Sequence, residues 1–135
     1  MVNFNYEADF KLNNEEKLEH WINDAVSEEN FKLGDVNYIF CTDPYLHKLN
    51  VEFLGHDTLT DIISFDYTVG KIIQGDIFIS VERVQENATY YNVDFNNELL
   101  RVMIHGILHF CGYKDKTDGQ AKIMRSKEEY YMVRY

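Results

Sequence analysis

The chain has 135 residues, enough for a single domain, residues 1–135, with a hydrophobic core that needs no disulfide staples. Hydrophobic residues make up 45% of it and aromatic residues 15%, which excludes an intrinsically disordered chain. No apolar run approaches the roughly 20 residues of a membrane span, and the N-terminus carries no secretory signal. We therefore expect a cytoplasmic protein without membrane contact, whose two cysteines, Cys41 and Cys111, are reduced thiols.

The formal net charge of −10 argues against a protein that coats nucleic acid non-specifically, because phosphate binding recruits lysine and arginine. The charge is distributed unevenly along the chain. Residues 99–135 hold seven of the 13 Lys and Arg residues but four of the 23 Asp and Glu residues. Residues 99–135 are therefore net positive, whereas residues 1–98 are strongly acidic. An anionic substrate that binds at the C-terminal end is compatible with this distribution.

The first third of the chain alternates strand and helix patterns. Apolar residues at every second position from Phe4 to Phe10 predict a half-buried strand. An apolar stripe at helical spacing, from Leu18 to Val26, predicts a helix capped by Asn13 or Asn14. The run Val36–Thr42 is apolar at nearly every position, which favours a central strand.

The middle of the chain predicts a helix followed by a hairpin. Asp43–Pro44 reads as a cap followed by proline at the first helical position, and this helix is expected to end near Gly55. Strands are predicted at Asp61–Asp66 and Ile72–Ser80, and the short turn between them indicates an antiparallel pair.

Three helices are predicted in the last part. The first spans roughly Val81–Tyr91, and the second is a long apolar helix capped by Asp94. A capping box of Thr117 and Gln120 begins the third, which ends near Met132. The whole pattern predicts an α+β fold, with a mixed sheet of about four strands and helices on its faces.

The long helix carries the pattern that points to chemistry. His105 and His109 lie four residues apart, so both imidazoles share one face of the helix. Gly112 is a natural helix stop, and Asp115 can swing back across the helix end. Two histidines and a carboxylate with an open fourth position are typical of a catalytic zinc site at the C-terminal end of the helix. The histidine pair, the glycine stop, the carboxylate and the apolar character of the helix coincide here. We therefore prefer a metal site to histidines with a purely structural role.

With these residues in view, the chain resembles the YbeY family of bacterial endoribonucleases, which are implicated in ribosomal RNA maturation. The metal motif of that family resembles His-Gly-x-Leu-His-x-x-Gly-Tyr-Asp-His, and His105–Tyr113 follows it position by position. Further agreement lies in the block Leu49–Phe65, in Gly75–Ile77, and in Met124 with Glu128. The similarity spans about residues 49–128.

The resemblance implies a zinc-dependent endoribonuclease that is specific for single-stranded RNA and acts in ribosomal RNA processing and ribosome maturation. One zinc ion would be held by His105, His109 and Asp115, with Asp115 in place of the family's third histidine. The two histidines would act in catalysis through a metal-bound water that attacks the phosphodiester. The implied partners are single-stranded RNA or a ribosomal RNA precursor, and ribosomal proteins.

Leu54 stands where the family commonly carries an arginine thought to serve RNA binding or catalysis, so phosphate contacts fall to other side chains. The candidates for substrate binding are His56, Lys114, Lys116 and Arg125. We expect the loop Gly55–Asp61 to line the cleft, or else to act only as a helix-to-strand connection.

The partners of the metal ligands are less defined by the pattern. Asp61 and Asp76 are candidates to fix an imidazole tautomer, with a plain buried hydrogen bond favoured for Asp76. Glu128 and Glu129 are either general bases or solvated charges on the last helix, and Met124 is expected in the core.

Two alternative functions remain open at this point. The first is a metalloprotease or another metal-dependent hydrolase, since the histidine spacing echoes zinc proteases. Against it, Gly106 occupies the position of the glutamate that deprotonates the water in those enzymes. The second is a non-catalytic ribosome-assembly factor with a structural metal, suggested by the missing base and by Leu54.

Overall fold

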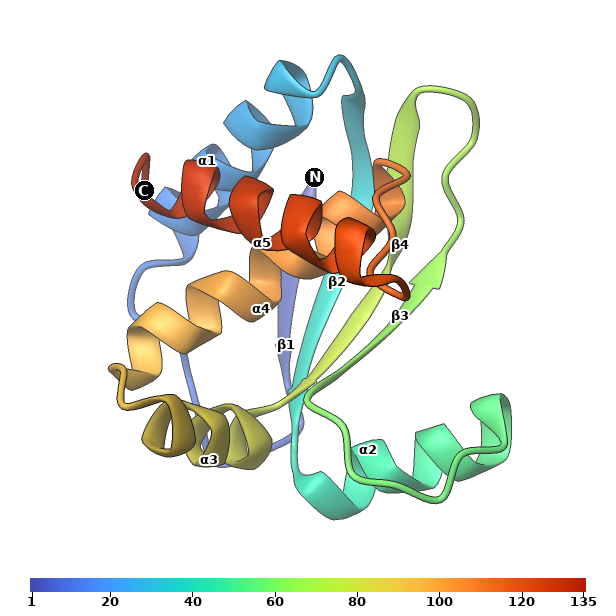
Figure 1. The fold of residues 1–135 in the computed structure, drawn as a ribbon, viewed down its shortest axis with the longest axis vertical. Coiled ribbons are helices and arrows are strands. Elements are labelled where there is room, and N and C mark those ends of the chain that lie inside the picture. Colours follow the sequence, from blue (N-terminus) through green and yellow to red (C-terminus); the bar gives the residue numbers. More distant parts are fainter.

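A four-stranded mixed sheet forms the frame of the molecule, which a computed structural model describes over residues 1–135 (Figure 1). Its strands are β1 (Val2–Tyr6), β2 (Lys32–Cys41), β3 (Ile62–Asp66) and β4 (Ile72–Ser80). They lie in the order β1-β2-β4-β3, with β1, β2 and β4 parallel and β3 antiparallel to β4. The predicted hairpin and the central position of β2 are therefore confirmed.

Helices cover both faces of the sheet, and together with it they confirm the predicted α+β fold. The helices are α1 (Glu15–Glu28), α2 (Asp43–Leu49), a short π-helix η1 (Asn50–Leu54), α3 (Val81–Tyr91), α4 (Phe95–Phe110) and α5 (Asp118–Met132). The helices α1, α4 and α5 share one hydrophobic core against one face of the sheet, and α5 crosses over α4 (Figure 1). Helix α2 packs on the other face through Leu46, beside Cys41 and Ile63. No helix is both long and apolar enough to cross a bilayer.

The main core forms where alternate residues of the two central strands meet α4. Tyr38 and Phe40 of β2 and Ile77 of β4 are completely buried, because a strand turns every second side chain to the same face. Ile104 of α4 is buried against them. The Tyr38 hydroxyl also donates a hydrogen bond of 2.9 Å to the Met103 carbonyl, which fixes α4 on the sheet.

Three predicted details are corrected. The first strand ends at Tyr6 instead of Phe10, because its partner β2 ends one residue beyond the Tyr6–Phe40 pair. The rest of the predicted strand turns, and Phe10 packs its ring 5.4 Å from that of Phe40. Strand β2 begins at Lys32, four residues earlier than predicted, and a bulge follows Leu33.

The third correction concerns the start of α2. Thr42 is its N-cap and accepts a hydrogen bond from the Tyr45 amide, whereas the prediction placed the cap at Asp43. Asp43 instead accepts hydrogen bonds from Ser80 (2.6 Å) and Arg83 (2.8 Å), which join α2 to the start of α3. The predicted end of this helical segment at Gly55, which has a φ of 67°, is confirmed, as is the capping box of Thr117 and Gln120.

Candidate metal centre

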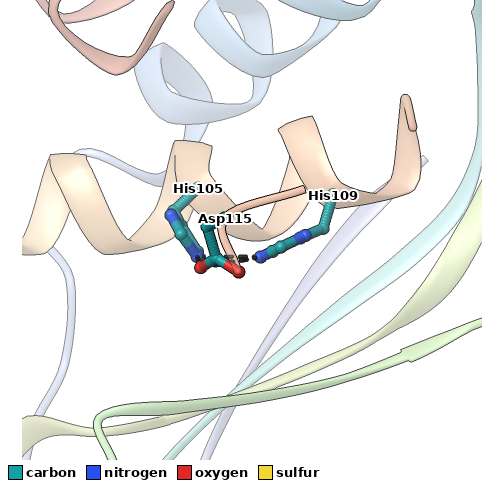
Figure 2. Close-up of side chains that lie close together, drawn as sticks. All are labelled: His105, His109 and Asp115. Atoms are coloured by element: carbon teal, nitrogen blue, oxygen red, sulfur yellow. Dashed lines mark hydrogen bonds and ion pairs between the residues drawn. The ribbon is translucent and has the colours of Figure 1, made fainter. Parts of the chain in front are cut away.

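Helix α4 presents the two histidines side by side near its C-terminal end (Figure 2). The four-residue spacing places their ring centroids 4.5 Å apart, with the ring planes nearly perpendicular. The Nε2 atoms of His105 and His109 face each other at 3.0 Å. Both side chains are half-buried, so they remain accessible from one side.

The loop after α4 brings the carboxylate back to these rings. Gly112 has a φ of 102°, a conformation that L-residues rarely adopt, and its amide donates to the His109 carbonyl at 3.0 Å. This reversal places Asp115 Oδ2 at 3.3 Å from His105 Nε2 and 3.4 Å from His109 Nε2. The carboxylate points between the two imidazoles (Figure 2). The structure thus brings together the three residues that the spacing predicted.

Each imidazole is oriented through its other nitrogen. His109 Nδ1 lies 2.9 Å from the Tyr113 carbonyl, and because a carbonyl can only accept, this nitrogen carries the proton. His105 Nδ1 lies 2.6 Å from Glu128 Oε2, a carboxylate that is buried at 4% exposure. Both contacts leave the Nε2 lone pairs free for a metal ion; a zinc-binding histidine usually bonds its other ring nitrogen to a carboxylate or a carbonyl in this way.

The donor set fits one zinc ion. Two Nε2 atoms and Asp115 Oδ2 lie 3.0 to 3.4 Å apart, and in a tetrahedral site with bonds of about 2.0–2.1 Å the ligand atoms are about 3.3 Å apart. Two lone pairs and a carboxylate oxygen at such distances repel one another unless a cation or a proton lies between them. The chain offers no other group of three ligand residues with this geometry.

The three candidate ligands lie in a cleft of about 490 Å³ between α4, α5 and the edge strand β3. Its floor follows one face of α4, where Glu98, Arg101, His105 and His109 recur at helical spacing. The remaining lining residues are Thr60, Asp61, Ile62, Ser64, Asn87, Tyr91, Val102, Asp115, Ala121, Met124, Arg125 and Glu128. A volume of this size suits a small organic ligand or a few units of a flexible polymer.

The charged side chains of the cleft are linked to the candidate ligand His105. Arg101 donates to Glu128 Oε1 at 3.0 Å, so Glu128 joins a cation to His105, and Arg101 also lies 3.9 Å from Glu98. Burial raises the pKa of Asp61 and of Glu98 above the usual carboxyl range. For His105, burial opposes the charged form, but the Glu128 hydrogen bond and neighbouring carboxylates outweigh it and raise the pKa.

Comparison with known proteins identifies the family. The family model described as Endoribonuclease YbeY matches residues 3–135. The chain belongs to the YbeY family. A YbeY endoribonuclease of Flavobacterium johnsoniae is 61% identical over 129 residues, which cover 96% of this chain and 93% of that protein. A second, from Christiangramia forsetii, is 59% identical over 128 residues, or 95% and 90% of the two chains.

A solved structure shares the fold of this chain. The solution structure of a Thermotoga maritima protein matches with a TM-score of 0.69 and 30% identity, covering 98% of this chain and 87% of the other. The resemblance to the YbeY family and the expectation of an enzyme, a nuclease of the hydrolase class, are therefore confirmed.

The structure places the predicted substrate residues of this YbeY protein at different distances from the cleft. Arg125 lines the cleft and has no carboxylate partner. Lys114 and Lys116 are exposed on the loop that carries Asp115, outside the residues that line it. Leu54, the last residue of η1, and His56, which follows this helix, are both exposed and do not line the cleft either.

Of the predicted loop Gly55–Asp61, Thr60 and Asp61 reach the cleft. Asp61 forms no hydrogen bond to a histidine but accepts one of 3.4 Å from Asn87. Asp76 accepts from Asn37 at 2.9 Å, in agreement with a plain hydrogen-bonding role.

Sequence reasoning missed the main partner of His105. The sequence pattern predicts either a general base or a solvated charge at Glu128, whereas this side chain is buried and hydrogen-bonded to the imidazole. A signal was present, because Met124, Glu128 and Tyr131 recur at helical spacing and form the buried face of α5. The involvement of Arg101 and Glu98 had no comparable signal, since both are ordinary residues on the surface of a helix until α5 covers them.

Proposed function

We propose that this YbeY protein is a zinc-dependent endoribonuclease specific for single-stranded RNA, which acts on ribosomal RNA precursors in the cytoplasm. The observation that carries the proposal is the convergence of His105, His109 and Asp115 in an open cleft. Its relatives at up to 61% identity bear the name endoribonuclease. Ribosomal proteins are proposed as further partners in ribosome maturation.

The three ligands would hold one zinc ion and leave a fourth position for water or substrate. A bound zinc ion supplies a Lewis acid and lowers the pKa of its water to about 7. The chain's own contribution is orientation: Glu128 and the Tyr113 carbonyl hold the two Nδ1 protons, so that both Nε2 atoms stay available. Asp115 adds a negative charge where the family pattern has a neutral histidine.

Arg125 is the cation best placed for the RNA phosphate. It lines the cleft from α5 and has no acidic partner, while Arg101 is paired with Glu128. Lys114 and Lys116 lie on the neighbouring loop, where they could contact the phosphates of an RNA strand as it leaves the cleft. His56 would meet the substrate only farther from the metal. Single-stranded RNA suits this site because its unpaired backbone can bend into a narrow cleft.

A protease reaction is disfavoured by the position of Gly106. A Cβ atom at this residue would lie 2.9 Å from Ile77 Cδ1 and 3.2 Å from Ile62 Cδ1, so the position faces the sheet. A glutamate at 106 would therefore have no room to reach the metal ligands as the base of a zinc protease does. This is a structural reason against protein hydrolysis by that route.

The central experiment measures metal content and cleavage together. Purified protein, with and without chelator, is given labelled single-stranded RNA, the same RNA as a duplex, and casein. We expect that only single-stranded RNA is cleaved. This cleavage should be lost when the metal is chelated and in the variant His109→Ala. Elemental analysis should find no zinc in His105→Ala. The matched control is His20→Ala, because His20 is exposed on α1 and away from the cleft.

Three results would contradict the proposal. Full zinc occupancy in His105→Ala would exclude the metal site, and unchanged cleavage in His109→Ala would point to a contaminating nuclease. If neither form of the RNA nor casein is cut but chelation lowers the melting temperature, the metal is structural and the protein is an assembly factor.

The role of Arg125 is tested by RNA binding at several salt concentrations. Arg125→Ala is expected to weaken binding of all single strands alike and to reduce the slope of log affinity against log salt by about 0.7–1. The matched control is Lys122→Ala, one turn away on the exposed side of α5. Equal effects of the two substitutions would assign the binding to overall charge and exclude a contact by Arg125.

A further inference from the structure

The carboxylate of Glu29, outside the cleft, accepts hydrogen bonds from the loop after α4 and from α5, two elements that support the candidate metal site. Glu29, the C-cap of α1, accepts from the Tyr113 hydroxyl through Oε1 at 2.7 Å. Its other oxygen, Oε2, accepts from Lys127 at 3.1 Å and from the Tyr131 hydroxyl. Tyr113 belongs to the loop after α4, whereas Lys127 and Tyr131 belong to α5, which lies beside α1 in Figure 1.

The Glu29 side chain is 10% exposed, so its charge must be matched by donors. Burial opposes ionisation, but the hydrogen bonds from Tyr131, Tyr113 and Lys127 outweigh it and lower the pKa of Glu29 below its usual value. Glu29 is therefore a carboxylate with strong, charge-assisted hydrogen bonds, which are suited to holding a loop in one place.

Tyr113, which Glu29 Oε1 holds, is linked both to His109 and to Asp115. The backbone carbonyl of Tyr113 accepts the His109 Nδ1 proton at 2.9 Å, and Asp115 follows two residues later. Apart from the contacts of Asp115 to the histidines, the Tyr113 hydroxyl makes the one side-chain hydrogen bond of residues 112–115. The position of this loop is thus set by its backbone turn, by packing of the Tyr113 ring against the core and by the hydrogen bond to Glu29.

We propose that Glu29 is a positioning residue of the metal centre. By holding the Tyr113 hydroxyl, it keeps the Tyr113 carbonyl against His109 and keeps the Asp115 carboxylate within reach of both imidazoles. The inference rests on the proposed zinc site, and it assigns to α1, an element without any residue in the cleft, a part in metal binding.

The two tyrosines that donate to Glu29, one to each carboxylate oxygen, allow a matched pair of variants. Tyr113→Phe and Tyr131→Phe each remove one hydroxyl that bonds to the same carboxylate. Only Tyr113 belongs to the loop after α4 that carries Asp115. A purely structural role of the cluster predicts that both substitutions have similar effects. A positioning role predicts that they differ in metal affinity.

The experiment measures zinc affinity by competition with a chromophoric chelator and the melting temperature of the metal-free protein. We expect Tyr113→Phe and Glu29→Gln each to weaken zinc binding about tenfold, which is the lower end of the effect for residues that orient a ligand without binding the metal. Tyr131→Phe is expected to stay within about twofold of the wild type. The double variant Glu29→Gln/Tyr113→Phe should lose less than the product of the two single losses, because both act through one hydrogen bond.

A second readout needs no metal. In nitrogen NMR spectra of the metal-free protein, His109 of the wild type and of Tyr131→Phe should carry its proton on Nδ1, and Tyr113→Phe should show a mixture of tautomers. Equal zinc affinities for Tyr113→Phe and Tyr131→Phe would overturn the inference while leaving the zinc site intact. Failure of the wild type itself to bind zinc would instead overturn the proposed metal site, and the inference with it.

Discussion

Two glycines bring α4 close to the sheet, and their replacement by alanine should have very different costs. At Gly75 in β4, an added Cβ would lie 2.6 Å from Phe110 Cζ and even closer to the carbonyl oxygen of Phe65. At Gly106 in α4, the three atoms nearest to an added Cβ belong to the side chains of Ile77 and Ile62, at 2.9 to 3.2 Å. The first site is blocked by backbone and a ring, the second by flexible aliphatic side chains.

The free-energy terms can be compared site by site. Overpacking costs about 1–3 kcal/mol and should reach about 3 kcal/mol at Gly75, because the carbonyl belongs to a paired strand and cannot move aside. At Gly106, an overpacking cost of about 1–2 kcal/mol is offset by about 1 kcal/mol from the higher helix propensity of alanine. We therefore expect Gly75→Ala to be about 2 kcal/mol less stable than Gly106→Ala.

Urea unfolding of the metal-free variants provides the assay. With a slope of about 1–3 kcal/mol per molar urea, a difference of about 2 kcal/mol separates the two midpoints by about 1 M. Gly119→Ala is the control, since nothing lies within 4 Å of its added Cβ. Equal midpoints for Gly75→Ala and Gly106→Ala, or a lower midpoint for Gly106→Ala, would refute the reasoning from these contacts.

Three further predictions concern buried charge and helix ends. Glu128→Gln should weaken zinc binding about 10–100-fold in chelator competition, because one acceptor cannot serve both His105 and Arg101; unchanged affinity would contradict this. Thr117→Ala should lower the free energy of unfolding by about 1 kcal/mol through loss of the capping box, measured in urea. The lowered pKa of Glu29 stabilises the fold above the usual carboxyl pKa, and this contribution is lost as pH falls through the lower folded value. The stability gap between wild type and Glu29→Gln, followed by urea midpoints from pH 7 to pH 3, should therefore shrink in acid.

Features encoded by neighbouring residues could be predicted from the sequence. The bounds of β4 and α3 and the capping box at Thr117 follow from local periodicity and cap chemistry. The convergence of His105, His109 and Asp115 could also be predicted, because a helical spacing and one glycine turn place them together.

Features that depend on distant partners could not be predicted in the same way. The end of β1 is set by the length of β2, and the choice of Thr42 over Asp43 as cap reflects the competing hydrogen bonds of Asp43 to Ser80 and Arg83. The burial of Glu128 requires that α5 crosses α4, which the composition of a largely polar helix does not reveal.

The two histidines differ in how far they are protected against mutation. The acceptor for His109 is a main-chain carbonyl at position 113, and every amino acid would supply it there. The acceptor for His105 is the side chain of Glu128, so one nucleotide change in its codon can remove it. Random substitution therefore degrades the site asymmetrically: the orientation of His109 can be displaced but not deleted, whereas that of His105 depends on a single replaceable residue.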